Sequence, residues 1–249
     1  MQLIHGDCLE KMKDIQDKSI DMILCDLPYG LTAPVWDSII DMSALWTEYR
    51  RIIRNKGAIV LFASQPFTTK LISSNEKQFK YCWYWAKNQG TNFFHAKRMP
   101  IRKIEEICVF NGGAYFPQHT TGHIPTNSAK GCSNGKAYHG TNKRDYVGGK
   151  TERYPTNILE FKCVDNYSRL HSSEKPITLL EYLIKTYTLE GEIVLDNCMG
   201  SGSTGVACIN TNRNFIGIEK DDKYFEIAKN RINNHLTIVE GDNAKAVAP

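Results

Sequence analysis

The sequence predicts an α/β fold built on a doubly wound, mostly parallel sheet. Short apolar runs alternate with segments whose apolar residues recur every three or four positions, the pattern of strands joined by crossover helices. A glycine-rich turn at 200–205 follows one predicted strand and opens a helix, as in sheets that bind a nucleotide at the carboxyl ends of their strands. A length of 249 residues allows one such domain with an insert.

The first half of the chain contains three predicted strands and one helix. Residues 20–25 and 57–63 are continuous apolar runs, as expected of strands that are buried on both faces. Residues 80–86 form a third, unusually aromatic run. Between the first two, residues 43–54 carry apolar side chains at helical spacing, and Gly57 follows as a predicted helix cap.

Regular patterns return in the last third of the chain. Glycine-containing turn signals dominate residues 111–150, and the order of residues 87–157 is hard to assign. The later predicted elements are a helix from Pro176, an N1-type proline, to Tyr187, a strand at 192–196, a helix from about Gly202, a strand at 214–219 and a helix to about His235.

The charge is distributed unevenly along the chain. The formal net charge is +4, but residues 87–153 hold 11 Lys and Arg against 4 Asp and Glu, whereas the remainder holds 20 against 23. A basic, glycine-rich segment between acidic flanks suggests a surface for a polyanion. The alternative is a solvated insert with no partner.

Cysteine usage and the chain start favour a cytoplasmic protein. The eight cysteines form no Cys-x-x-Cys pair, which predicts free thiols in a reducing compartment and no metal site. No apolar run is long enough to span a membrane, and no membrane partner is expected. The first residues lack the form of a signal peptide, so we expect a cytoplasmic location.

The first candidate site is Asp26-Leu27-Pro28-Tyr29, at the end of the strand predicted at 20–25. Asp26 offers a carboxylate acceptor, and Pro28 restricts the conformation of Leu27, so that the Leu27 carbonyl is held in a limited range of directions. Tyr29 adds an aromatic face. Two fixed acceptors and one stacking surface suit a planar base that carries an exocyclic amine, although a strand followed by a proline turn explains the same residues.

The second candidate site is Gly200-Ser201-Gly202-Ser203-Thr204-Gly205, followed by an acid, Glu219, at the end of the next predicted strand. This context indicates a nucleoside cofactor whose ribose hydroxyls the acid binds. Asp196, four residues before Gly200, separates two cofactor classes. A carboxylate repels a dinucleotide pyrophosphate but pairs with the methionine ammonium of S-adenosylmethionine, which we therefore expect.

Together these two motifs resemble the β-class amino DNA methyltransferases, in which the catalytic motif precedes the target-recognition region and the cofactor motif comes last. Trp85-Ala86-Lys87-Asn88 resembles the aromatic motif of that class beside the flipped base, and Ser173-Glu174-Lys175-Pro176 its motif at the start of the cofactor-side helix. The resemblance implies a Rossmann-like, permuted S-adenosylmethionine-dependent methyltransferase fold. It also implies site-specific, duplex-DNA methylation at the adenine N6 amine.

The resemblance extends over nearly the whole chain, with two departures. Leu27 stands where proline is usual, which should matter little because the contributed group is a backbone carbonyl. Cys198 stands where phenylalanine is common. The implied organisation is a catalytic half at 1–90, a basic, loop-rich target-recognition insert at 91–170 and a cofactor-binding half at 171–249.

The predicted site residues fall into three groups. The catalytic residues are Asp26, Leu27, Pro28 and Tyr29. The cofactor residues are Asp7, Lys175, Asp196, Cys198, Gly200, Gly202 and Glu219. The DNA-binding candidates are Trp85 and Lys87, with Phe93 as another candidate beside the base, then Lys97, Arg98, Arg102 and Lys103 for phosphates, and Lys130, Lys136, Lys143 and Arg144 for the groove.

Some alternatives stay open at this level. The pattern around Asp7 is repeated around Asp242, and we favour Asp7 beside the cofactor adenine because it leads into the catalytic strand. Cytosine-N4 methylation, RNA methylation, a non-catalytic nucleic-acid binder and an NAD oxidoreductase are rival functions. The sequence does not give the recognition site, and it does not say whether the protein forms a homodimer or has a cognate restriction endonuclease. The expected host is a bacterium or a phage-infected cell.

Overall fold

The computed structural model describes residues 1–30, 40–125, 149–165, 167–171 and 173–247, with side chains to residue 241. Within these ranges the strands form one eight-stranded sheet with the order β1-β8-β7-β2-β3-β5-β4-β6. Only β5 runs antiparallel to its neighbours, and the other pairs are parallel. The predicted doubly wound, mostly parallel α/β sheet is therefore confirmed.

The predicted strands are present, but the strand predicted at 57–63 begins at Ile53. Gly57 therefore lies inside this strand and does not cap the preceding helix, which ends at Ile52. The strands are β1 (Gln2–His5), β2 (Ile20–Asp26), β3 (Ile53–Ala63), β4 (Phe79–Thr91), β5 (Arg102–Phe110), β6 (Ile158–Phe161), β7 (Ile193–Asp196) and β8 (Asn214–Glu219). The helices are α1 (Cys8–Met12), α2 (Met42–Ile52), α3 (Phe67–Ser74), α4 (Ile177–Tyr187), α5 (Ser203–Asn210) and α6 (Asp222–Val247), with short 3-10 turns η1 (Glu76–Gln78) and η2 (Phe93–His95).

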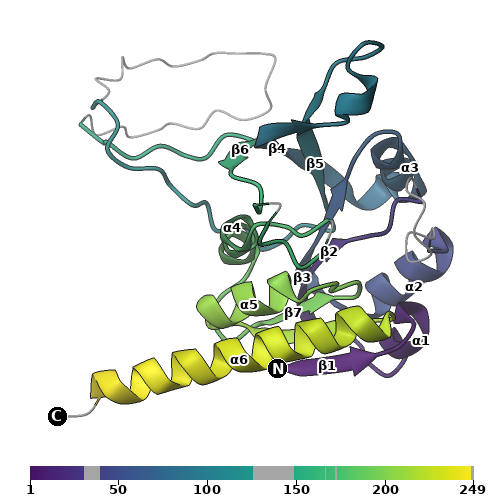
Figure 1. The fold of residues 1–249 in the computed structure, drawn as a ribbon, viewed down its shortest axis with the longest axis vertical. Helices are drawn as coiled ribbons and strands as arrows, with labels where there is room; N and C mark the ends of the chain where they lie inside the picture. Colours follow the sequence, from purple (N-terminus) through teal and green to yellow (C-terminus); the bar gives the residue numbers. More distant parts are fainter. Residues whose placement is uncertain (31–39, 126–148, 166, 172, 248–249) are drawn as a thin grey trace. The chain divides into compact units, whose positions relative to one another are not determined.

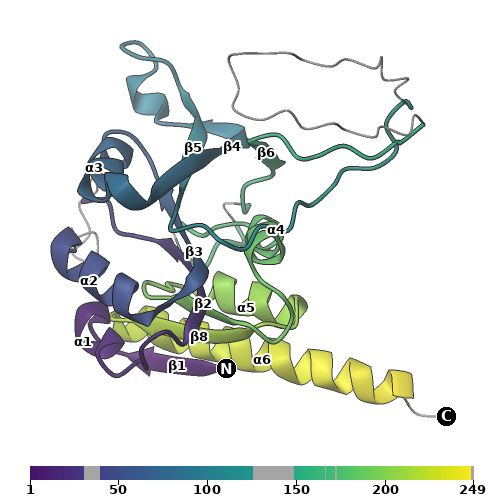
Figure 2. The same ribbon diagram turned by 180° about the vertical axis from the view of Figure 1, so that it is seen from behind.

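Two hydrophobic cores lie on the two faces of the sheet, because successive residues of a strand point to opposite faces. Met22 and Leu24 of β2 belong to the core covered by α4, α5 and α6. Ile23 and Cys25 of the same strand belong to the core covered by α1, α2 and α3. Figures 1 and 2 show the two groups of helices on opposite sides of the sheet. Burial on both faces explains why the central strands are continuous apolar runs.

Local capping sets where the helices begin. The Asp41 carboxylate accepts hydrogen bonds from the Ser43 and Ala44 amides at the start of α2, which satisfies amides that have no partner within the helix. Pro176 lies at the N-cap of α4, one position before the predicted N1 site, and provides no side-chain cap. The last helix, α6, continues to Val247, well beyond the expected end near His235.

The sequence patterns missed β5, which lies inside the sheet between β3 and β4. Its burial changes from an exposed start to a fully buried end, and Glu105 interrupts the apolar pattern. A buried acid normally argues against a core strand. Glu105 is tolerated here because the ammonium groups of Lys87 and Lys175 contact its carboxylate. The short elements α1, α3 and β6 were also not predicted.

The chain divides into two compact units, one formed by residues 1–116 and 157–249 and the other by residues 117–156. The second unit covers fewer residues than the insert predicted at 91–170, because β5 and β6, which lie within that range, belong to the sheet. Thr120 and Arg153 form a bridge within the second unit. Lys130, Lys136, Lys143 and Arg144 lie outside the described residues. No helix of the described chain is long and apolar enough to cross a membrane.

The N-terminal copy of the repeated pattern supplies a strand. β1 pairs in parallel with β8, with His5 opposite Glu219. Residues 237–242, which carry the second copy, belong to α6. The order of the strands therefore places Asp7, and not the second copy, beside the carboxyl end of β8.

Candidate active site

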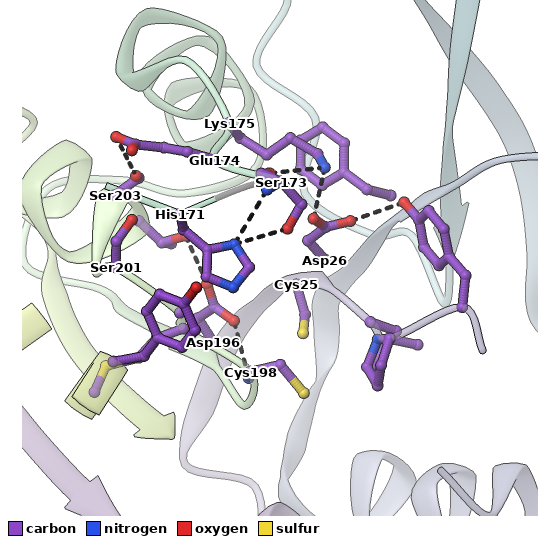
Figure 3. Close-up of a pocket in the computed structure, with 18 of the residues that line it drawn as sticks. Cys25, Asp26, His171, Ser173, Glu174, Lys175, Asp196, Cys198, Ser201 and Ser203 are labelled. Atoms are coloured by element: carbon purple, nitrogen blue, oxygen red, sulfur yellow. Dashed lines mark hydrogen bonds and ion pairs between the residues drawn. The ribbon is translucent and has the colours of Figure 1, made fainter. Parts of the chain in front are cut away.

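One pocket of about 920 Å³ joins the two predicted motifs. Asp26, Asp196 and Glu219 are the last residues of β2, β7 and β8, which are neighbours in the sheet and run in the same direction. Parallel strands end at one edge, so these three carboxylates meet there although they are far apart in sequence. Figure 3 shows Asp26 and Asp196 facing the same space, with His171 and Cys25 between them.

The Asp26 carboxylate has a partner on each oxygen. The Tyr29 hydroxyl donates to Oδ1 at 2.8 Å, and the Lys175 ammonium donates to Oδ2 at 2.6 Å. The Tyr29 ring stacks on Phe67 with 5.0 Å between ring centroids. Burial, reinforced by the Asp26 and Glu105 carboxylates, holds the pKa of Tyr29 well above its usual value, so its hydroxyl stays a donor. Asp26 is therefore held in a fixed orientation at the pocket wall.

Asp26 belongs to a buried network of ion pairs. Lys175 also contacts Glu105 Oε1 at 3.1 Å, and Lys87 contacts Glu105 Oε2 at 2.5 Å. Burial disfavours the charge on Lys175, but Asp26 and Glu105 outweigh it and raise its pKa. Burial also disfavours the charge on Glu105, and Lys175 and Lys87 hold its pKa below the usual value. The cluster is therefore a chain of alternating charges that satisfy one another in a low-dielectric site.

Two predicted site residues belong to this network, and a third, Trp85, lies beside it. Lys175, predicted among the cofactor residues, reaches Asp26 instead of the glycine turn. Lys87, predicted to bind DNA, is paired with Glu105 and lies 4.9 Å from the centre of the Trp85 ring. Trp85 is buried, and its Nε1 donates to the Phe161 carbonyl at 2.8 Å, while part of the side chain lines the pocket.

Asp196 is the second carboxylate of the pocket and is only 4% exposed. Its Oδ1 accepts a hydrogen bond from the Cys198 amide at 3.1 Å, and its Oδ2 accepts one from the Thr204 hydroxyl at 2.6 Å. Burial raises the pKa of Asp196 to about 6, and the hydrogen bonds from Thr204 and Cys198 limit the rise. A buried carboxylate held only by neutral donors in the described chain is a favourable position for a ligand cation.

The glycine turn brings backbone amides to the Glu219 carboxylate. Gly200 and Gly202 have φ angles of +51° and +78°, a region that suits glycine. The Gly200 amide donates to Glu219 Oε2 at 2.8 Å, and Oε1 accepts from the Lys220 and Asp221 amides. Burial raises the pKa of Glu219, although these amides lower it. Glu219 is therefore oriented by the backbone at the pocket edge.

The remaining predicted cofactor residues, Asp7 and Cys198, also line the pocket. The Asp7 side chain caps α1 by accepting from the Leu9 amide at 3.0 Å, and the Lys220 ammonium lies 3.6 Å from its other oxygen. The Cys198 thiol is protonated at neutral pH, because its interaction with Cys25 and its burial raise the pKa well above the usual value. It acts as a small, neutral wall of the pocket.

Glu105 is the main site residue that the sequence analysis missed. Its position opposite Trp85 follows from the antiparallel register of β4 and β5, which local patterns do not reveal. The available signal was a pair of adjacent acids, Glu105 and Glu106, inside the otherwise apolar run 104–110, in a chain that also has Lys87 within an aromatic strand. His171 was missed as well. It lines the pocket and packs against Tyr224, with 4.3 Å between the ring centroids.

Comparisons with known proteins agree with this geometry. The DNA methylase family N6_N4_Mtase matches residues 20–230. The chain is 24% identical to the type II methyltransferase M.HpaI of Haemophilus parainfluenzae, over 94% of this chain and 75% of that protein. It is 26% identical to the DNA adenine methyltransferase YhdJ of Escherichia coli (strain K12), over 92% and 82%.

Solved structures are similar as well. A crystal structure of M1.HpyAVI in complex with SAM superposes with a TM-score of 0.60 and 25% identity, covering 92% of this chain and 98% of that one. The family match spans most of the chain and includes both motifs that meet in the pocket. The chain belongs to the DNA methylase family.

Proposed function

We propose that this protein transfers a methyl group from S-adenosylmethionine to the exocyclic N6 amine of an adenine in duplex DNA. The observation that carries the proposal is that Asp26, Asp196 and Glu219, at the ends of three neighbouring parallel strands, line one pocket. The first carboxylate suits an amine substrate, and the other two suit a nucleoside that carries an ammonium group. The relative named as a DNA adenine methyltransferase supports the choice of adenine.

The residues of the cofactor end fit S-adenosylmethionine. Asp196 is buried and has no salt bridge among the described residues, so a ligand ammonium can pair with it. Glu219 and Asp7 offer acceptors for ribose hydroxyls and for the adenine amine, respectively. When bound, S-adenosylmethionine supplies the methyl group on a positively charged sulfur.

The residues of the Asp26 end would bind and orient the target amine. The Asp26 carboxylate and the Leu27 carbonyl accept hydrogen bonds from its two N–H groups, which favours a pyramidal nitrogen with a localised lone pair. Lys175 and Tyr29 already donate to the two Asp26 oxygens, so the amine enters as a further partner of a pre-oriented carboxylate. Such positioning is worth several kcal/mol of the barrier in general. The Tyr29 ring, backed by Phe67, is available to stack on the base.

A base inside a duplex cannot reach a pocket of this kind, so the target nucleotide must leave the stack. Cationic side chains near the pocket support DNA as the polymer. Lys97, Arg98, Arg102 and Lys103 are exposed, and they belong to the basic segment 87–153. Contacts of such side chains with phosphates position a protein on DNA without reading its sequence.

The test is to express the protein and its Asp26→Asn variant in a methylation-deficient bacterial host and to sequence the genomic DNA by a single-molecule method that reports modified bases. We expect N6-methyladenine at one short sequence with the wild type and none with the variant. If the sequencing instead found N4-methylcytosine, the target base would be cytosine and not adenine. If the DNA stayed unmodified and the purified protein methylated RNA, the substrate would be RNA and not DNA.

A further inference from the structure

The loop that joins β4 to β5 exposes two phenylalanine side chains. We call residues 92–101 the β4–β5 tip. Phe93 is 76% exposed and Phe94 is fully exposed, and Met99 and Ile101 are partly exposed beside them. Figures 1 and 2 show this loop and its short helical turn projecting beyond the ends of β4 and β5. Two adjacent aromatic rings that are largely exposed to water are costly unless a partner covers them.

The tip has internal structure that holds the rings outward. Asn92 adopts a left-handed conformation, with a φ angle of +71°, at the start of the 3-10 turn η2. The Ala96 amide donates to the Phe93 carbonyl at 3.0 Å, and the Arg98 amide to the His95 carbonyl at 2.8 Å. At the base of the tip the two strands approach closely, since a Cβ on Gly90 would lie 2.2 Å from Ile101. The rings are therefore presented from a closed turn.

The partner of this tip should be an anion. Residues 91–103 contain four cationic side chains, Lys97, Arg98, Arg102 and Lys103, and no acid. In the described part of the chain none of the four forms a salt bridge. Aromatic rings in the same loop as these cations match the surface of a nucleic acid, where bases alternate with phosphates.

The tip also begins at the rim of the active-site pocket. Thr91, Asn92, Arg102 and Ile104 line the pocket, and Phe93 follows directly in the chain. A nucleotide that enters the pocket leaves a gap in the duplex close to this rim. Apolar side chains that insert between bases are a general device by which proteins hold a distorted duplex.

We propose that Phe93 and Phe94 form a wedge that enters the base stack beside the flipped nucleotide, while Lys97 and Arg98 contact the adjacent phosphates. The inference rests on the proposed function, because it takes duplex DNA as the substrate. It adds a role that the pocket does not supply. The wedge lowers the cost of the open duplex, and the pocket residues act on the base after it has left the stack.

The experiment compares two duplexes that contain the methylation site found by sequencing. In one the target base is paired, and in the other it faces an abasic site, so that it leaves the stack at low cost. We expect the Phe93→Ala/Phe94→Ala variant to lose about tenfold or more in kcat/KM on the paired duplex, since the base must be unpaired and unstacked there without the wedge. On the abasic duplex it should stay within about threefold of the wild type, because the target base is already unpaired and leaves the stack without help from the wedge.

Two further variants separate a wedge from other roles. Phe93→Leu/Phe94→Leu keeps apolar bulk and should retain most of the activity on the paired duplex. Lys97→Ala/Arg98→Ala should lose activity equally on both duplexes, with a weaker dependence of DNA affinity on salt. Ile238→Ala, an exposed apolar position on α6, serves as the control. S-adenosylmethionine affinity and melting temperature should be unchanged throughout.

If Phe93→Ala/Phe94→Ala lost activity equally on both duplexes, or lost none on either, the wedge would be overturned. It would also be overturned by wild-type binding to anionic phospholipid vesicles that the double alanine variant lacks, or by a wild-type dimer that this variant dissociates in sedimentation. These results leave wild-type methylation intact and are thus distinct from a failure of the proposed function, in which the wild type modifies neither duplex.

Discussion

The Lys175 ammonium lies 2.6 Å from Asp26 Oδ2 and 3.1 Å from Glu105 Oε1, so one buried cation joins β2 to β5, a strand within the basic segment 87–153. β2 and β5 are not neighbours in the sheet, since β3 lies between them. The link therefore depends on a side chain from a third segment, just before α4. Asp26 is oriented by this cation and by the Tyr29 hydroxyl at the same time.

Removal of the bridging cation should destabilise the protein. We expect Lys175→Gln to lower the free energy of unfolding by about 3 kcal/mol at pH 7, because it leaves Asp26 and Glu105 buried without their common partner. The deficit should shrink at pH 5, since Glu105 without Lys175 takes up a proton more easily. Urea unfolding at the two pH values measures both effects, with Lys97→Gln as an exposed control. Equal stability of wild type and variant would show that the bridge contributes nothing.

Loss of the Asp26 carboxylate should abolish methyl transfer and spare the cofactor end. Asp26→Asn replaces one acceptor by a donor at the position proposed for the amine, and we expect turnover to fall by about 10² to 10³-fold or more. S-adenosylmethionine affinity, measured by calorimetry, should stay within a few fold, because Asp196 and Glu219 belong to other strands. Glu10→Gln, in an exposed pair with Lys13, is a matched control. Normal turnover of Asp26→Asn would remove Asp26 from the mechanism.

Protonation of Asp196 should govern both stability and cofactor binding near pH 6. Its pKa is raised from 3.8 to about 6 by burial, so between these values the folded state holds a proton that the unfolded state has released. Stability without cofactor therefore falls as pH rises through this window. Asp196→Asn should be more stable than the wild type above pH 6, by roughly 2–3 kcal/mol.

Cofactor affinity should follow the opposite course. The ammonium needs the charged carboxylate, so wild-type affinity falls as pH drops through about 6, and Asp196→Asn should bind weakly at every pH. Calorimetry and thermal unfolding between pH 5 and 8 give the two readouts, with Glu226→Gln as an exposed control on α6. Parallel pH profiles for wild type and Asp196→Asn would contradict the assignment.

The third glycine of the glycine turn should be needed for packing rather than for ligand contact. A Cβ on Gly205 would lie 2.4 Å from Ile232 Cδ1 and 3.0 Å from Phe215 Cε1, and both of these side chains are buried. We expect Gly205→Ala to cost about 1–3 kcal/mol of stability through overpacking between α5 and α6.

Gly241, also helical, provides the comparison, because apart from its chain neighbours and the nearby backbone of its own helix no atom of the described residues lies within 4 Å of the position that a Cβ would take there. Gly241→Ala should be neutral or slightly stabilising, as alanine favours helix. Chemical unfolding of the two variants tests the contrast, and a Gly205→Ala protein as stable as the wild type would refute the packing argument.

Local sequence patterns predicted much of the fold and the two motifs that meet in the pocket. Continuous apolar runs identified β2 and β3, because strands buried on both faces need apolar residues at every position. The glycine turn and the acid at the end of β8 identified the cofactor end, since the turn geometry requires glycine at positive φ. In each case the deciding interaction is local, or the residue type alone reports the environment.

The roles of Lys175, Lys87 and Glu105 were not visible in such patterns. A lysine or glutamate in a sequence reads as exposed, and only the register of β4 against β5 and the approach of the segment before α4 bring these charges together. The sequence also could not decide which copy of the pattern, the one around Asp7 or the one around Asp242, lies beside the cofactor end. A short pattern is compatible with a strand or a helix, and only the pairing of β1 with β8 decides for the first copy. Residue type is a property of the chain, whereas the partner that makes a buried charge tolerable exists only once distant segments have packed.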